Sequence, residues 1–310
     1  MTDATAAVAA PEKPSSLWRD VWLQFRMHKG ANVALWVLGA LILFSLIGPW
    51  LWRVDPNAIP SQAIDVIRGK NQGPSWAHPM GTDQLARDQM ARMMSGGRVS
   101  LSVGLVAMAV AITVGGTVGV LAGYFRRLDG ILMRFTDMFL ALPLLPLLLL
   151  MMFLFGDTAR AAIGQRLGIF MLIVLAIGLT SWMQAARIVR GEVLALKERE
   201  FILAARSIGT PPRRIITRHI LPNVLGPVMV SATLGVAAAI ITESVLSFLG
   251  VGFPSDFPTW GRLLNDAYGE MQIYPLRVFW PGLAISLTVL AVNYIGDGLR
   301  DALDPRIRGR

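Results

Sequence analysis

Long runs of apolar residues divide this 310-residue chain into six segments, each able to cross a membrane. The runs cover residues 31–52, 99–124, 131–155, 168–186, 224–249 and 278–295. A membrane-spanning α-helix takes about 20 mainly apolar residues, a length that all six runs approach or exceed. The pattern therefore predicts an all-α polytopic membrane protein with six transmembrane helices.

The segments between these runs complete the predicted organisation. Residues 1–30 predict a cytoplasmic tail and an interfacial helix, because tryptophans and basic residues are mixed there as they are at headgroup depth. Residues 53–98 are the longest hydrophilic stretch and predict an extracytoplasmic loop. Residues 99–310 hold the other five spans and predict the core domain. With both termini cytoplasmic, 19 of the 29 Lys and Arg residues lie inside, which supports this orientation.

Residues 197–223 are a polar, basic stretch between the fourth and fifth spans. Helix-forming residues run to Ile208, and Gly209 can adopt the left-handed conformation that ends a helix. Thr210 can cap a second helix, with Pro211 in its first turn and Pro222 breaking it before the next span. The stretch predicts two short helices that meet at a stiff corner. The alternative is a surface loop that only joins two spans.

Two spans carry internal signals of close packing. Pro143 and Pro146 interrupt the third span and predict a bend, while Arg134 is expected to neutralise Asp137 one turn away. Small residues recur at every fourth position of the second span, so another helix is expected to approach it closely. These small residues are Ala107, Ala111, Gly115, Gly119 and Gly123.

Glu243 lies inside the fifth apolar run, where a carboxylate is costly unless it is protonated, paired or facing water. Two interpretations stay open. The carboxylate lines a pathway through the membrane, or it lies near the interface and its charge reaches the outer surface. Asn293 in the last span is the second candidate for a pathway-lining residue.

Composition agrees with a membrane protein and narrows the chemistry. Hydrophobic residues make up 54% of the chain and charged residues 16%, below the roughly 25% of soluble domains. The absence of cysteine excludes disulfides, thiolate nucleophiles and Cys-ligated metals. The net charge of +9 comes from basic residues beside apolar runs rather than from a separate basic domain, which argues against nucleic acid as a partner.

The sequence holds no recognisable catalytic motif. It lacks a phosphate-binding loop, an HExxH motif and a dinucleotide fingerprint, so we expect no enzyme activity and no cofactor in this chain. His78 with Asp83 and Asp88 allows a metal site. A turn cap and a salt bridge explain the same residues without a ligand, so no metal is expected.

Three stretches resemble permease subunits of ATP-binding-cassette (ABC) importers of the peptide type. Residues of the corner stretch follow the EAA loop of those permeases at Ala204, Ala205, Gly209, Ile220, Leu221 and Pro222, with departures at Leu203 and His219. Residues 78–101 resemble a His-Pro-x-Gly-Thr-Asp stretch and its continuation, and residues 281–305 match the family's C-terminal region almost without a gap.

The resemblance implies the type I ABC importer permease fold and the second, C-type, permease component of the importer. It implies a second homologous permease, two ATPase subunits that bind ATP and Mg, and an extracytoplasmic solute-binding protein, all at a bacterial inner membrane. The resemblance also implies dipeptides and oligopeptides as substrates, with nickel chelates, opines, glutathione and sugars as alternatives. The resemblance places the corner in contact with the ATPase through Glu200, Ala204, Ala205, Arg206, Gly209, Arg213 and Arg214.

Two rival classes predict features that the sequence does not show. A self-powered secondary transporter would be expected to pair acidic residues inside its spans or to repeat its two halves. Glu243 alone lies well inside a span, and we find no internal repeat. A membrane-embedded enzyme would need a cluster of nucleophile, base or metal ligands within the spans, and none is evident.

Overall fold

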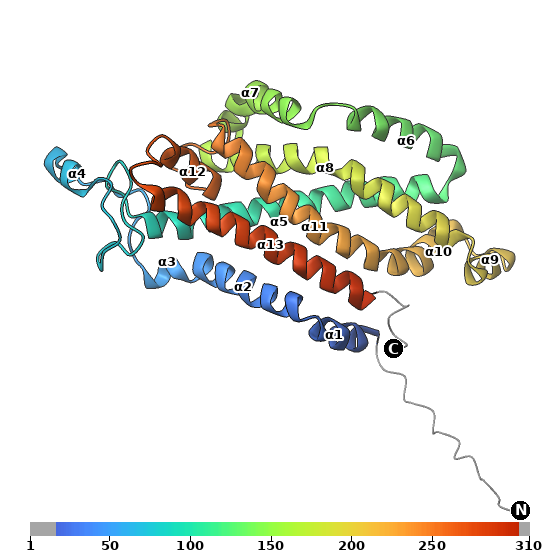
Figure 1. Cartoon of the computed structure of the whole chain (residues 1–310). Helices are drawn as coiled ribbons and strands as arrows, with labels where there is room; N and C mark the ends of the chain where they lie inside the picture. The colour runs from blue at the N-terminus through green and yellow to red at the C-terminus, as the bar shows by residue number, and fades with distance from the viewer. Residues whose placement is uncertain (1–16, 304–310) are drawn as a thin grey trace, which may run out of the picture.

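The computed structural model describes residues 17–303 as an elongated bundle of helices (Figure 1). Among these residues, six helical segments are long and apolar enough to cross a membrane, as the sequence predicts. They are α2 (Lys29–Leu46), α5 (Gln89–Tyr124), α7 (Leu144–Ile163), α8 (Gln165–Lys197), the continuous segment Pro212–Phe248, and α13 (Pro275–Leu303). Residues 1–16, the predicted tail, lie outside the described part.

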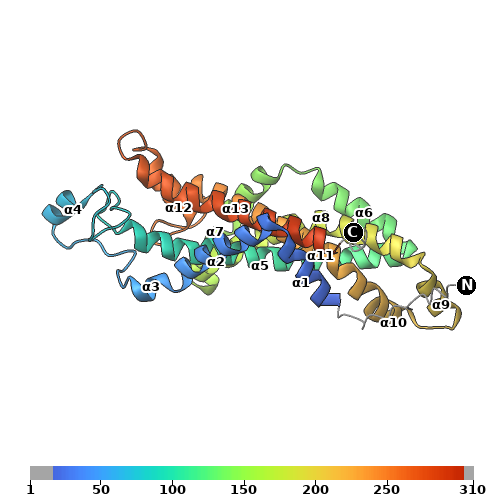
Figure 2. The same ribbon diagram turned by 60° about the horizontal axis from the view of Figure 1, so that its bottom comes forward.

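Shorter elements lie at the two ends of this bundle (Figures 1 and 2). We call one end the loop end; it carries α3 (Gly48–Leu51), α4 (Ala63–Gly69) and α12 (Trp260–Tyr268). The other, the corner end, carries α9 (Glu200–Ser207) and α10 (Pro212–Ile215). α6 (Arg126–Leu140) runs with α7 along one edge, and α1 (Leu17–Met27) precedes α2 along the opposite edge.

α5 and α8 form the central pair, and the predicted small-residue stripe lies between them. A Cβ atom built on Gly119 would stand 2.6 Å from the Ala186 carbonyl oxygen, and one on Gly123 would stand 2.7 Å from Val193 Cβ. Because such contacts are too short for any side chain, the two backbones approach as closely as the glycines allow. The prediction of a closely packed second span is confirmed.

The predicted third span is two helices rather than one bent helix. α6 ends at Leu140 and α7 begins at Leu144, with Pro143 as its N-cap residue. Pro146 then lies in the first turn of α7. Amide groups of a first turn have no partner within the helix, so prolines there cost nothing. The two prolines therefore start a helix instead of bending one.

Two ion pairs link α6 to α8. Arg187 Nη2 lies 2.6 Å from Asp137 Oδ1, so the predicted pairing of Asp137 with Arg134 is wrong. Arg190 Nη2 donates to Asp129 Oδ2 at 2.8 Å. The hydrogen bonds from the Arg190 guanidinium keep the pKa of the Asp129 carboxyl below its usual value. Both pairs are partly exposed, so each contributes modestly to stability.

Several helices extend beyond their predicted boundaries, because helical structure continues through polar residues. Residues 157–167, predicted to connect two spans, are helical except at Gly164, whose φ is 87°. The loop predicted over residues 53–98 ends at residue 88, ten residues earlier than predicted, because α5 begins at Gln89. The last helix runs from Pro275 to Leu303, beyond both predicted limits. Hydrophobicity marks the part of a helix that can lie in lipid, while helical structure extends past it.

The predicted interfacial helix α1 packs against the end of α13. Val21 and Phe25 are buried, exposed 5% and 7%, and cluster with Ala31 and Ala302. Trp22 and Leu23 are half exposed. Contact of this outer side with the membrane surface stays a prediction.

Candidate functional site

The corner between α9 and α10 has the geometry that the sequence predicts. Gly209 has φ of 77°, in the left-handed region. Its N–H donates to the Arg206 carbonyl at 2.9 Å, and the Thr210 N–H donates to the Ala205 carbonyl at 3.0 Å. These two bonds form a Schellman motif, which ends a helix and fixes the direction of the next residues. The chain therefore turns sharply and with little freedom at Gly209.

An apolar cluster beneath the corner joins it to the long helices. Ile202 of α9 and Ile215 of α10 are buried, at 0% and 1% exposure, against α8 and α5. The cluster consists of Val120, Val189, Val193, Ile202, Ala205, Ile215, Ile220 and Val224. Arg206 adds a cation–π contact, with its guanidinium carbon 5.3 Å from the centre of the Tyr124 ring. The corner is thus packed as part of the bundle.

The outer surface of the corner combines exposed apolar and basic side chains. Ile208 beside the turn is 82% exposed, and Phe201 and Leu203 are 45% and 44% exposed. Six of the seven residues predicted for the partner contact are exposed, while Ala205 packs inwards at 8% exposure. The exposed six are Glu200, Ala204, Arg206, Gly209, Arg213 and Arg214.

Two local predictions for the second half of the corner are wrong. Thr210 does not cap α10; Pro211 is its N-cap residue and Pro212 its first residue. Pro222 does not end the helix, because α10 continues through a π-helical turn, η1 (Ile216–Ile220), into α11 (Leu221–Phe248). The wide turn accommodates the proline ring, and Asn223 Nδ2 donates to the His219 carbonyl at 2.6 Å. The second half of the corner and the fifth span are therefore one continuous helix.

Glu243, near the loop end of α11, is fully buried. In this structure it therefore lies neither on an open pathway nor at the outer surface, the two positions that the sequence left open. Ser247 Oγ donates to Glu243 Oε1 at 2.7 Å, and Ser100 Oγ of α5 donates to Oε2 at 3.0 Å. The Trp260 N–H donates in turn to Ser100 Oγ at 3.2 Å. In this structure the carboxylate joins α5, α11 and α12 and lines no open pathway.

A cavity of about 520 Å³ opens between α8, α11 and α13 toward the corner end. Its charged lining residues are Glu192 and Arg300, beside Ser231 and apolar side chains. Asn293 is half buried on α13 and is not among the lining residues. This cavity could not be predicted from the sequence, because its walls come from three segments that are distant in the chain.

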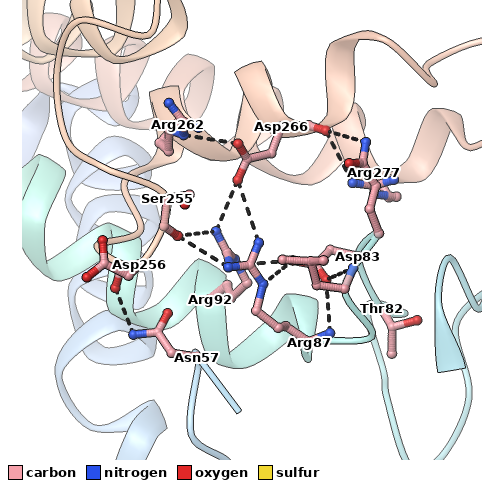
Figure 3. Close-up of polar contacts among 12 residues, drawn as sticks. Asn57, Thr82, Asp83, Arg87, Arg92, Ser255, Asp256, Arg262, Asp266 and Arg277 are labelled. Atoms are coloured by element: carbon pink, nitrogen blue, oxygen red, sulfur yellow. Dashed lines mark hydrogen bonds and ion pairs between the residues drawn. The ribbon is translucent and has the colours of Figure 1, made fainter. Parts of the chain in front are cut away.

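Arginine and aspartate side chains fasten the loop end (Figure 3). Arg92 is fully buried, with Nη2 at 3.2 Å from Asp266 Oδ2 and Nη1 at 3.4 Å from Asp83 Oδ2. Arg87 Nε donates to Asp83 Oδ2 at 2.7 Å. Both arginines also donate to the Ser255 carbonyl, at 3.3 and 3.2 Å. The network joins the start of α5 to the segment around α12.

In the same region, Asp83 and Asp88 make the turn-cap and salt-bridge contacts that the sequence predicts. Asp83 Oδ1 accepts from the N–H groups of Leu85 and Arg87, both at 2.9 Å, as a turn cap does. Asp88 is the N-cap residue of α5 and accepts from the Ala91 N–H at 2.7 Å. His78 Nδ1 lies 2.7 Å from Asp88 Oδ2. Each carboxylate is thus occupied by protein partners.

Among the described residues, six helices long and apolar enough to cross a membrane, with an exposed basic corner at one end and a charged network at the other, define a polytopic all-α membrane protein. Residues 115–309 match the family described as the binding-protein-dependent transport system inner membrane component. Residues 16–74 match the N-terminal transmembrane domain of oligopeptide transport permease C. The chain belongs to this permease family, as a C-type component and a multi-pass membrane protein.

Curated relatives match almost the whole chain. The oligopeptide transport system permease protein OppC of Bacillus subtilis is 36% identical over 298 residues, covering 96% of this chain and 92% of the relative. The dipeptide transport system permease protein DppC of the same organism is 39% identical over 300 residues, covering 96% and 88%.

A solved structure supports the fold. It is described as inward-facing conformations of the MetNI methionine ABC transporter, and its chain aligns with a TM-score of 0.54 at 19% identity. The alignment covers 70% of this chain and 98% of that chain. The fold is therefore that of type I ABC importer permeases.

Proposed function

We propose that this chain is one of two permease subunits of an ATP-driven importer for dipeptides and oligopeptides, and that ATPase subunits act on it through the corner. The exposed apolar and basic surface around Ile208 carries the proposal, because α9 packs on the long helices through the apolar cluster and α10 continues directly into α11. The similarity to oligopeptide and dipeptide permeases supports the peptide substrate.

The partners follow from what this chain lacks. Transport against a gradient needs an energy source, and its sequence contains no phosphate-binding loop. We propose that two ATPase subunits bind the ATP and Mg, that a second homologous permease completes the pathway, and that an extracytoplasmic protein delivers the solute. Movement of the corner would then tilt the spans between outward-open and inward-open arrangements.

The proposed orientation places the corner end in the cytoplasm of a bacterial cell and the loop end outside its inner membrane. Residues 187–218 hold eight Lys and Arg against three Glu, an excess expected of a cytoplasmic segment. In this orientation both chain termini are cytoplasmic. The cavity with Glu192 and Arg300 then opens on the cytoplasmic half of the bundle.

Single-cysteine labelling tests the ATPase contact, since the chain has no cysteine of its own. We expect Ile208→Cys to react with a water-soluble maleimide when the permeases are present alone and to be protected once the ATPase subunits are assembled. Trp76→Cys is the control, because Trp76 is 100% exposed at the loop end. Its labelling should not change. Equal labelling of Ile208→Cys with and without the ATPases would remove the corner from the contact.

Reconstituted uptake tests the substrate and the energy source. Proteoliposomes that hold both permeases and both ATPases, with the solute-binding protein outside, should accumulate a labelled dipeptide or tripeptide only in the presence of internal ATP on the ATPase side. Accumulation driven by an ion gradient without ATP would support a secondary transporter instead. ATP-driven uptake of a nickel chelate, opine or sugar but not of peptides would retain the importer and change its solute.

A further inference from the structure

One turn between the corner and α11 is wider than an α-helical turn. It covers Ile216–Ile220, and the Leu221 N–H donates to the Ile216 carbonyl five residues earlier. Such π-turns are rare, arise mostly as single turns within α-helices, and are frequent at functional sites. A turn of this kind contains one residue more than an α-helical turn. It therefore changes which side chains on its two sides share a face.

The burial of two isoleucines shows the effect. Ile215 and Ile220 are exposed 1% and 0%, and both belong to the apolar cluster beneath the corner. In an uninterrupted α-helix, residues five apart point roughly 140° away from each other, because each residue turns the helix by 100°. The wide turn brings these two side chains to the same side. Val224 continues that face one α-helical turn further on.

An α-helical turn here would present a different residue to the cluster. Counting back from Ile220 by four and by seven residues reaches Ile216 and Arg213. Arg213 would then face Val189 and Val193 in place of Ile215. Burial of a guanidinium without an acidic partner costs several kcal/mol, whereas Ile215 gains by burial. In the structure Arg213 and Arg214 are both exposed.

We propose that the π-turn sets the register of the corner: its extra residue turns Arg213 and Arg214 outwards while Ile215 anchors the corner to α5 and α8. This inference rests on the proposed function, because it assigns the two arginines to the surface that meets the ATPase. The partner surface that fits them is acidic, around an apolar depression for Ile208.

Pro222 favours the wide turn. In α-helical geometry its ring would collide with the carbonyl four residues earlier, that of Arg218, and it has no N–H to offer that carbonyl.

Thr217 is the residue of this turn that can be removed with least loss, because it is exposed and its hydroxyl bonds only to the Arg213 carbonyl of its own helix, at 2.9 Å. Pro222 and the π-turn act by positioning other residues.

Two one-residue changes at the same place test the register. The first deletes Thr217 and replaces Pro222 with alanine, which turns the π-turn into an α-helical turn but leaves Ile215 and Ile220 on one face. The second inserts one alanine between Thr217 and Arg218, which rotates the corner by about 100°. Each change is combined with Arg213→Cys or with Ile215→Cys. The full chain is labelled with maleimide in membranes that lack the ATPase subunits.

The two variants should behave in opposite ways. The deletion should leave Arg213→Cys reactive and Ile215→Cys protected, and without the cysteines it should keep ATP-driven uptake. The insertion should expose Ile215→Cys, reduce labelling of Arg213→Cys and lower uptake more than about tenfold, the effect of 1.4 kcal/mol. A local disturbance alone would impair both.

The outcomes separate the register from the function. If the insertion leaves Ile215→Cys protected, or the deletion exposes it, the π-turn does not set the register. If labelling changes as expected and uptake by the insertion variant stays normal, the register assignment stands and the proposed role of the corner is lost.

Discussion

At the scale of single residues, Glu243 shows how much of a side chain's role can be predicted from its type and its position in the sequence. Its position in an apolar run marks it as exceptional from sequence. One partner, Ser247, lies in the same run, but the other, Ser100, lies 143 residues earlier, and the Trp260 amide is linked to the carboxylate only through Ser100. The cost of a buried carboxylate could be predicted, but the three elements that share it could not.

The first prediction concerns this buried group. Glu243→Ala leaves the hydroxyls of Ser100 and Ser247 without their acceptor, so we expect a loss of about 1–3 kcal/mol for each. Glu243→Gln keeps an acceptor and should cost less. Thermal unfolding of the detergent-solubilised assembly measures both. Thr242→Ala is the matched control, since Thr242 bonds only to the Ala238 carbonyl of its own helix. Unchanged stability of Glu243→Ala would contradict the structural role.

The second prediction concerns Gly209. A β-branched residue tolerates a φ of 77° poorly, so Gly209→Val should distort the corner although no neighbouring atom obstructs its Cβ. We expect ATP hydrolysis that solute no longer stimulates, with the normal amount of protein in the membrane. Gly209→Asn, which accepts left-handed geometry more readily, should retain most coupling. Full solute-stimulated uptake by Gly209→Val would show that the corner geometry is dispensable.

At the scale of elements, apolar runs predict where the helices lie and fail where prolines or polar residues decide the ends. The sequence locates the corner, its left-handed glycine and the packing stripe of α5. It does not distinguish a proline that starts a helix, as Pro143 does, from one that bends it. Pro222 is the opposite case, because a π-turn absorbs it and the helix continues. These outcomes depend on the neighbouring helices, which a local pattern does not contain.

The third prediction tests the contact between α5 and α8. Gly119→Ala places a methyl group 2.6 Å from the Ala186 carbonyl oxygen, so the helices must separate, at about 1–3 kcal/mol. Gly116→Ala is a control on the same helix, because no atom outside it lies within 4 Å of its Cβ. It should be neutral or stabilising, since alanine favours a helix over glycine. Equal melting temperatures of the two variants would contradict the packing.

At the scale of the whole molecule, the two ends are held by different interactions. The corner end rests on an apolar cluster, whereas the loop end rests on the charged network around Arg92. That network joins residues 83–92 to residues 255–277. The sequence predicts the turn cap and the salt bridge of Asp83, whose residues lie in one stretch. It could not predict Asp266 as the distant partner.

The fourth prediction concerns this network. Arg92→Ala leaves Asp83 and Asp266 with fewer positive neighbours and should destabilise the loop end by about 3–5 kcal/mol, the usual effect of breaking a buried ion pair. Limited proteolysis of residues 53–88, together with thermal unfolding, measures the change. Arg53→Ala is the control, because Arg53 is exposed and its guanidinium bonds to the Trp50 carbonyl. Similar cleavage of both variants would count against the network.

Helix α8 runs for 33 residues, roughly 50 Å, without a break, from Gln165 to Lys197 just before the corner. A stiff helix of this kind can transmit a displacement from either end to the other. Under the proposed function, if the nucleotide state of the ATPases alters the affinity of the loop end for a delivered solute complex, then arrival of that complex must alter nucleotide affinity by the same factor. The permease would then convey the presence of cargo to the ATPases as a change in their affinity for nucleotide.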